Sequence, residues 1–130
     1  MRFNHVANRL AAPWFETVVA LLTTRLGFVE LRRTERAIWL RQPGANIDLR
    51  FSRSATTSRD ADKLRSQISF LSDTPEAALR ELAVWLDARG LAASVGSYSD
   101  REFYLDAPDA FVDFVVEAMT PALAEYDIAV

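Results

Sequence analysis

The stretch RAIWLRQPGANIDLRF, residues 36–51, recurs in altered form as REFYLDAPDAFVDFVV at residues 101–116. Shifted by 65 positions, the two stretches share an arginine, a leucine, a proline, an alanine and an aspartate: Arg36 and Arg101, Leu40 and Leu105, Pro43 and Pro108, Ala45 and Ala110, Asp48 and Asp113. Each stretch reads as two strands joined by a turn that contains proline. The chain therefore contains the same supersecondary unit twice.

The repeat extends beyond these strands to a helix in each half of the chain. In the first half, Pro13 suits the first helical position, and apolar residues recur every four positions up to Gly27. In the second half, Pro75 begins the helix and Gly90 ends it. A strand-like segment precedes each helix and three follow it, so both halves have the order β-α-β-β-β.

These two units indicate an α+β fold that forms one domain, residues 1–130. We expect tandem βαβββ modules in a curved mixed sheet around a cleft, with the helices on the outer face, because one unit cannot cover its own sheet. A polar segment, SRSATTSRDADK, separates the modules. The expected parts are module one at 2–52, a linker at 53–64, module two at 65–117 and a C-terminal tail at 118–130.

Composition narrows the classes of function. A net charge of −3 argues against a nucleic-acid-binding protein, which needs clustered lysine and arginine. The absence of cysteine excludes disulfide scaffolds, thiolate metal sites and cysteine nucleophiles, and it agrees with a reducing compartment. The N-terminal MRFNHVANR lacks the apolar segment of a signal peptide, and the longest apolar stretch is interrupted by charges. We therefore expect a cytoplasmic protein without a membrane partner.

The alternation of side chains along a strand decides where the repeated aspartates point. In NIDLRF, the side chains of Asp48 and Arg50 share one face, and the apolar side chains share the other, which must pack on a helix. In AFVDFVVE, the same alternation turns Asp113 away from the helix and into the cleft. Because an uncompensated buried carboxylate is costly, the two acids require a cation, a basic partner, protonation or water.

Four short motifs, in this order, resemble the vicinal oxygen chelate superfamily, which includes glyoxalase I, bleomycin-resistance proteins, fosfomycin-resistance enzymes and extradiol dioxygenases. NHVA at 4–7 is similar to the family's first strand, and LGF at 26–28 is similar to the turn after its first helix. QISF at 67–70 looks like the strand that opens the second module, and APDAFVDFVV at 107–116 looks like the final turn and strand. The resemblance covers nearly all of residues 3–117 and implies the paired βαβββ fold.

The resemblance also implies a metal site, since the family's ligands lie on the first and last strands of each module. The matching positions are His5 and Asp48 in the first module, and Gln67 and Asp113 in the second. His5 and Gln67 are residue types that the family uses, whereas both aspartates depart from its usual glutamate. This oxygen and nitrogen set suits one divalent ion of Mn, Fe, Co, Ni or Zn.

Each of these residues also has a purely structural interpretation. Asp48 can pair with Arg41 or Arg50 instead of a metal ion. His5 can be a neutral, hydrogen-bonded side chain, and Gln67 can satisfy nearby backbone groups. The residue types alone do not decide between a metal site and a polar wall.

Two functions are therefore weighed. The first is a small-molecule-binding protein of the glyoxalase and bleomycin-resistance type, with a polar-lined apolar cleft. The second is a divalent-metal-dependent lyase, isomerase or epimerase that acts on a substrate with adjacent oxygens. A third interpretation, in which the fold serves dimerisation or regulation and the cleft is incidental, stays open.

The remaining expectations concern the walls and the edges of the fold. We expect the cleft to be lined by Trp39, Arg50, Phe103 and Phe111, and Glu117 to be a surface charge at the end of its strand. Unpaired strand edges on each module favour a homodimer.

Overall fold

The computed structural model describes residues 4–45, 47–55, 63–64 and 66–124. The first half contains β1 (His5–Ala11), a 3₁₀ helix (Ala12–Trp14), α1 (Phe15–Thr24), β2 (Val29–Arg33), β3 (Ala37–Arg41) and β4 (Asp48–Ser54). The second half contains β5 (Gln67–Leu71), α2 (Pro75–Asp87), β6 (Ser94–Ser97), β7 (Glu102–Asp106), β8 (Val115–Met119) and a 3₁₀ helix (Pro121–Ala124). This order confirms the predicted β-α-β-β-β repeat, although Asn46, most of the expected linker and the end of the tail lie outside the described residues.

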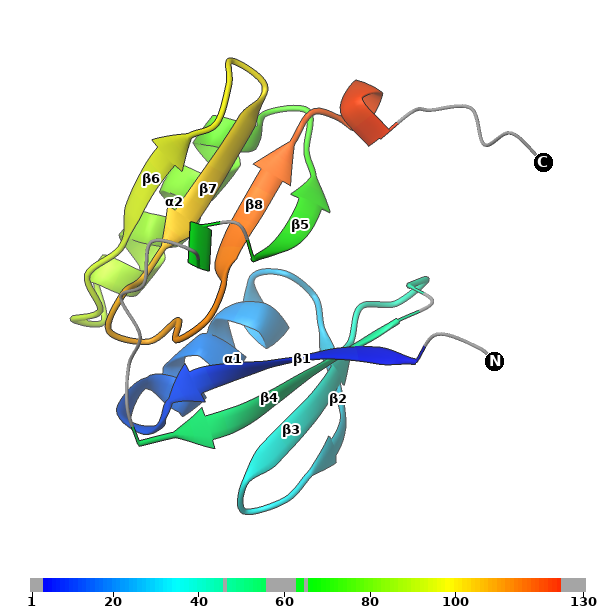
Figure 1. Ribbon diagram of the computed structural model, residues 1–130, viewed down its shortest axis with the longest axis vertical. Coiled ribbons are helices and arrows are strands. Elements are labelled where there is room, and N and C mark those ends of the chain that lie inside the picture. Colours follow the sequence, from blue (N-terminus) through cyan, green and yellow to red (C-terminus); the bar gives the residue numbers. More distant parts are fainter. Residues whose placement is uncertain (1–3, 46, 56–62, 65, 125–130) are drawn as a thin grey trace.

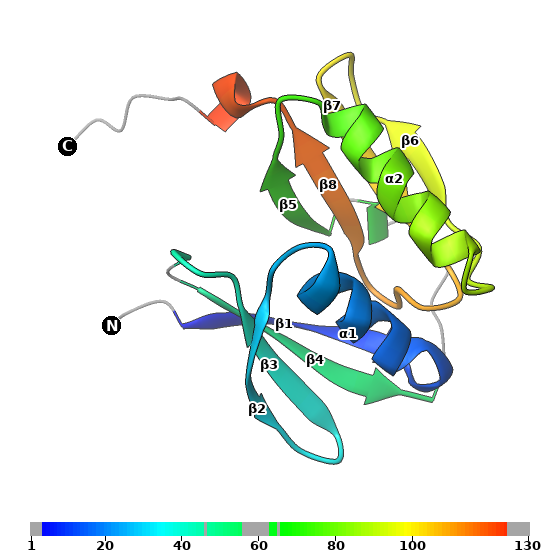
Figure 2. The ribbon, with the colours of Figure 1, turned by 180° about the vertical axis from the view of Figure 1, so that it is seen from behind.

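The strands form two mixed sheets of four strands each, and the sheets do not close on each other. The orders are β1-β4-β3-β2 and β5-β8-β7-β6, so the second sheet repeats the first. In Figure 1 the sheets lie one above the other, and Figure 2 shows from behind that α1 and α2 cover the same side of the molecule. We call the side of each sheet that faces away from its helix the open face.

The helices begin and end at residues that the sequence marks. Pro13 lies in the 3₁₀ helix before α1, and Pro75 is the first residue of α2. Gly27 and Gly90 have φ angles of 71° and 84°, a conformation that favours glycine, and they redirect the chain after each helix. No helix in the described ranges is long and apolar enough to cross a membrane.

One hydrophobic core joins the two modules. Phe51 from β4 contacts the ring of Phe114, with ring centroids 5.7 Å apart, and Phe114 in turn stacks on Phe111 at 4.7 Å. All three side chains are fully buried. The core also takes in apolar side chains from both helices, so each module supplies part of the surface that buries the other.

A backbone pairing holds the modules together at the edge of the first sheet. The loop between β7 and β8, residues 107–114, runs beside β1 on the side that β4 does not occupy. The N–H of Ala11 donates to the carbonyl of Ala110 at 2.9 Å, and the N–H of Val112 donates to the carbonyl of Arg9 at 3.3 Å. This pairing covers part of a strand edge that would otherwise be unpaired.

We expect the substitution Phe114→Ala to lower the free energy of unfolding by about 3–5 kcal/mol, because it leaves a cavity between the two modules. Urea unfolding measured by circular dichroism checks this value. Val84 on α2 is 68% exposed, so Val84→Ala is a matched control that should change the free energy of unfolding by less than about 0.5 kcal/mol. A similar loss in both variants would contradict a core shared by the modules.

Candidate functional site

The open face of the first sheet carries the polar residues that the strand alternation predicts. In β4, Leu49 and Phe51 are buried in the core, whereas Asp48 and Arg50 alternate with them and lie on the opposite face. Trp39 of β3 is the Cα partner of Arg50 and therefore shares that face. Trp39, Arg50 and Asp48 thus lie on the side of the sheet that faces away from the helix.

His5 and Asp48 are brought together, as Cα partners on the parallel strands β1 and β4. Asp48 is 7% exposed, and Arg41 donates from Nε to its Oδ1 at 2.5 Å. This hydrogen bond raises the pKa of the Arg41 guanidinium. His5 is exposed, and its Nδ1 lies 2.8 Å from Oδ1 of Asn4. The structural interpretation of Asp48, an ion pair with Arg41, is the one observed.

Asp113 does not occupy the position that the repeat assigned to it. Strand β8 begins only at Val115, and Val115 is the Cα partner of Gln67. The connection before β8 has eight residues, 107–114, whereas the equivalent connection before β4 has six, 42–47. The prediction of a continuous strand through Asp113 is wrong, because the residues before Val115 pair with β1 of the other sheet.

The carboxylate of Asp113 instead binds β1. Its Oδ1 accepts the backbone N–H of Arg9 at 3.1 Å and the side-chain amide of Asn8 at 3.3 Å. Its Oδ2 accepts Nε of Arg9 at 3.1 Å. Asp113 therefore satisfies a backbone donor on the strand edge and links the modules.

Glu117 is the acidic residue of β8 that lies beside β5, and the sequence analysis did not predict this position for it. It is the Cα partner of Ser69, whose hydroxyl donates to its Oε1 at 2.7 Å. Glu117 is only 7% exposed, so the prediction of a surface charge is wrong. Neighbouring Val116 and Ala118 belong to the core, and this alternation places Glu117 on the open face.

Gln67 lies at the start of β5 and faces a tyrosine. Its Nε2 donates to the carbonyl of Leu64 at 3.4 Å, and the hydroxyl of Tyr98 donates to the same carbonyl at 2.5 Å. Burial raises the pKa of Tyr98, the hydrogen bond with Gln67 acts to lower it, and the negative charge of Glu117 adds to the rise. Gln67 therefore satisfies a local backbone group, as its structural interpretation expected.

Two of the four expected wall residues lie elsewhere. Phe111 is fully buried, because it forms a bridge with Leu10 of β1 inside the core. Phe103 packs towards the core, since its Cα partner is the buried Ala118. Tyr104, the next residue, takes the open face in its place, with its ring over Gly96, where an added Cβ would lie 2.2 Å from the ring.

Lys63 is a further residue that sequence reasoning missed. It falls in the polar segment expected to be a linker, yet it is 7% exposed. Its Nζ donates to the carbonyl of Phe111 at 2.7 Å and pairs with Asp106 at 2.8 Å. A buried lysine requires such partners.

The arrangement observed does not fit a metal ion. Asp48 and Asp113 are each held by an arginine and lie in different surroundings. Within the described part of the chain, there is no group of three or more His, Cys, Asp or Glu side chains that could hold a metal ion. His5 and Asp48 together supply two donors, fewer than the three or four that protein metal sites use. A shared site for all four residues stays a prediction.

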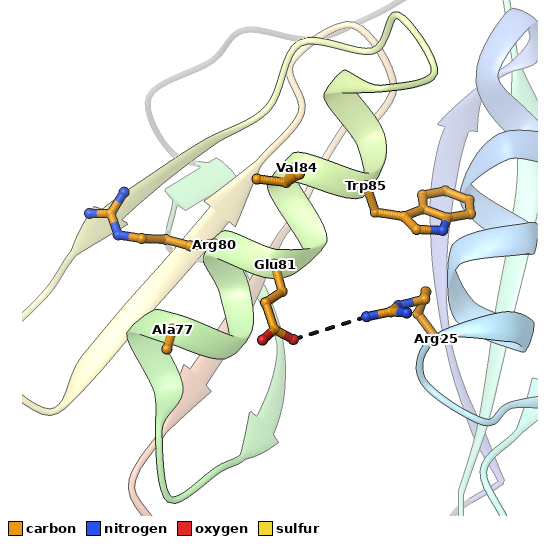
Figure 3. A pocket seen from close by; sticks show the side chains of 6 residues that line it. All are labelled: Arg25, Ala77, Arg80, Glu81, Val84 and Trp85. Atoms are coloured by element: carbon orange, nitrogen blue, oxygen red, sulfur yellow. Dashed lines mark ion pairs between the residues drawn. The ribbon is translucent and has the colours of Figure 1, made fainter.

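A separate groove lies on the helix side of the molecule, shown in Figure 3. It has a volume of about 580 Å³ and is lined by Arg25 and by residues of α2. The Oε2 atom of Glu81 on α2 lies 4.0 Å from the Nη2 atom of Arg25, and the indole of Trp85 lies beside this ion pair. The groove is on the opposite side of the sheets from the open faces.

Comparison with known proteins finds the fold in solved structures. No family model matches the chain, and no curated protein matches it. A possible glyoxalase from Bacillus cereus aligns with 92% of this chain and 98% of its own, with a TM-score of 0.59 and 16% identity. The bleomycin-binding protein of Streptomyces verticillus, in complex with copper(II)-bleomycin, aligns with 92% and 98%, with a TM-score of 0.53 and 22% identity.

A third similar structure is the fosfomycin resistance protein FosX of Listeria monocytogenes, complexed with Mn(II) and sulfate. It aligns with 92% of this chain and 88% of its own, with a TM-score of 0.55 and 11% identity. These similarities show that the chain shares its fold with these glyoxalase-like, bleomycin-binding and fosfomycin resistance proteins. Since fold does not decide chemistry, the function must be argued from the open faces.

We expect Asp113→Ala to lower the free energy of unfolding by about 1–3 kcal/mol, because the N–H of Arg9 loses its acceptor. Chemical unfolding measures this loss. Asp100→Ala is the control, since the side chain of Asp100 is 92% exposed and 3.8 Å from its nearest cation; it should change the free energy of unfolding little. If both variants were equally stable, Asp113 would not link the modules.

Proposed function

We propose that this protein binds a small molecule on the open faces of its sheets, as a glyoxalase-like and bleomycin-resistance-like binding protein. The observation that carries the proposal is the half-buried indole of Trp39, which lies on an open face between two arginines. Ligand sites combine aromatic surface with a few polar groups, and this face has that composition.

The second sheet supports the proposal because it repeats the aromatic feature. Tyr104 lies 65 positions after Trp39 and on the open face of β7, next to Glu117. Tyr98 packs against it with ring centroids 4.9 Å apart. Aromatic side chains on uncovered sheet faces offer stacking surface at a low entropic cost.

The similar structures support small-molecule binding by this fold. The bleomycin-binding protein holds copper(II)-bleomycin, and FosX is a fosfomycin resistance protein. Transfer of such a role to this chain rests on the open faces described above. We also propose that the protein is a homodimer, because among the described residues no strand pairs with the outer edges of β2, β5 and β6. We propose a cytoplasmic location because the chain contains no cysteine, which agrees with a reducing compartment.

A divalent-metal-dependent lyase, isomerase or epimerase is the second candidate function. The observation that favours it is the register pairing of His5 with Asp48, the combination that the family resemblance implies for the first module. The ion pair of Asp48 with Arg41 counts against it, because the carboxylate already has a cationic partner. We therefore rank it below small-molecule binding.

We expect a ligand screen to give binders that the Trp39→Leu variant binds about tenfold more weakly, a loss of about 1.4 kcal/mol. Thermal shift identifies the binders, and chemical-shift changes in two-dimensional NMR spectra should cluster on β3, β4 and β7. Val84→Ala, on the helix side, is the control and should bind as the wild type does. Binders that perturb only the groove beside Arg25 would overturn the proposed site.

For the metal-dependent alternative, we expect less than one ion per chain after incubation with Mn, Fe, Co, Ni or Zn and dialysis. Elemental analysis of untagged protein provides the measurement. Asp48→Asn should retain the same amount as the wild type, because Arg41 and not a metal ion holds this carboxylate. Near-stoichiometric metal in the wild type that disappears in Asp48→Asn would reverse our ranking of the two functions.

A further inference from the structure

We infer that the first sheet selects a planar ligand that carries an anionic group, such as an aromatic carboxylate, sulfonate or phosphate. This inference rests on the proposed small-molecule function and names the class of ligand. It is carried by one row of side chains across the open face. Arg32 of β2, Trp39 of β3 and Arg50 of β4 are Cα partners in adjacent strands, so they lie side by side.

Both arginines lie against the indole. The guanidinium carbon of Arg32 is 4.9 Å from the ring centroid of Trp39, and that of Arg50 is 5.2 Å from it. Stacking on an aromatic ring orients a guanidinium while leaving its N–H groups in its plane free to donate. The row therefore presents a ring with donors on two sides.

The charge of this row is not compensated by acids. The other two arginines of the open face are paired, Arg41 with Asp48 at 2.5 Å and Arg9 with Asp113 at 3.1 Å. Among the described residues, neither Arg32 nor Arg50 has a carboxylate within ion-pair distance. Two unpaired guanidinium groups beside one ring attract an anion, and their planar forks match a carboxylate or phosphate.

Small side chains lie on one side of the row, and the paired Arg41 and Asp48 lie on the other. Ala7 of β1 is the Cα partner of Arg50 and ends the row on the β1 side. Ala37 precedes Trp39 by two residues on the same face of β3, and its partner there is Ser52. Apart from the two guanidinium groups over its ring, no bulky side chain from these neighbouring positions covers the indole, so a ligand ring can pack on the part of it that the arginines leave exposed.

The repeat gives an internal comparison with the opposite charge. In the second sheet, the row that corresponds to Arg32, Trp39 and Arg50 consists of Gly96, Tyr104 and Glu117. An anion would be repelled there by the Glu117 carboxylate. The two sheets therefore share an aromatic centre but differ in the sign of the neighbouring charge, which assigns the anionic group to the first sheet.

Four probes test the ligand class: three naphthyl compounds of similar size, 2-naphthoate, 2-naphthalenemethanol and 2-naphthylmethylammonium, and acetate as a small anion without a ring. Titrations followed by calorimetry and NMR should show that naphthoate binds at least tenfold more tightly than the alcohol, and that the ammonium compound and acetate bind weakest. The affinity for naphthoate should fall as salt is raised, because the guanidinium charges are exposed to solvent.

Variants separate the charge from the ring. Arg32→Gln and Arg50→Gln should each weaken naphthoate about five- to tenfold while leaving the alcohol unchanged, and Trp39→Leu should weaken both. Arg89→Gln is the matched control, since Arg89 follows α2 and its guanidinium carbon lies 3.4 Å from the ring centroid of another indole, that of Trp85 on α2. It should bind all four probes as the wild type does.

The outcomes distinguish this inference from the proposed function. If the alcohol or the ammonium compound binds at the indole of Trp39 as tightly as naphthoate, the anionic class is wrong, whereas small-molecule binding stands. If acetate binds as tightly as naphthoate, the requirement for a ring is wrong. If no probe binds, the inference fails, and the independent ligand screen decides whether the open faces bind small molecules at all.

Discussion

The relative position of the two sheets depends on one short pairing, that of residues 110–113 with β1. Its backbone hydrogen bonds join Ala11 to Ala110 and Val112 to Arg9, and the Asp113 carboxylate accepts the backbone N–H of Arg9. Because this segment leads directly into β8, the pairing fixes the start of the second sheet's central strand against the first sheet. The open faces keep their orientation for this reason.

The same segment is held from its other side by a buried cation. Lys63 donates to the carbonyl of Phe111 and pairs with Asp106 at the end of β7. A buried ammonium group without partners would be strongly destabilising, so these two contacts stabilise the buried position of the lysine. Lys63, which lies just before the second module, is thereby bound to the loop between β7 and β8 that pairs with β1.

Much of the fold was predictable from the sequence, because the repeat and the alternation along each strand are local signals. They predict the two helices, the order of the strands and the open-face positions of Trp39, Asp48 and Arg50. The sequence did not reveal that the strands divide into two sheets of four, since the pairing between modules depends on residues far apart in the chain. The burial of Phe111 has the same origin, because its partner is Leu10.

The candidate site was predicted only in the first module, because a two-residue difference in loop length displaces the register in the second. A register shift of two residues leaves each side chain on the same face of the strand, so the alternation of polar and apolar residues cannot reveal the shift. In evolutionary terms, an insertion of two residues before Asp113 in the 107–114 loop would bring Asp113 into the place of Val115, beside Gln67. Insertion and deletion in one loop, rather than substitution on a strand, would then decide whether a duplicated module presents an acid or an apolar side chain to its ligand.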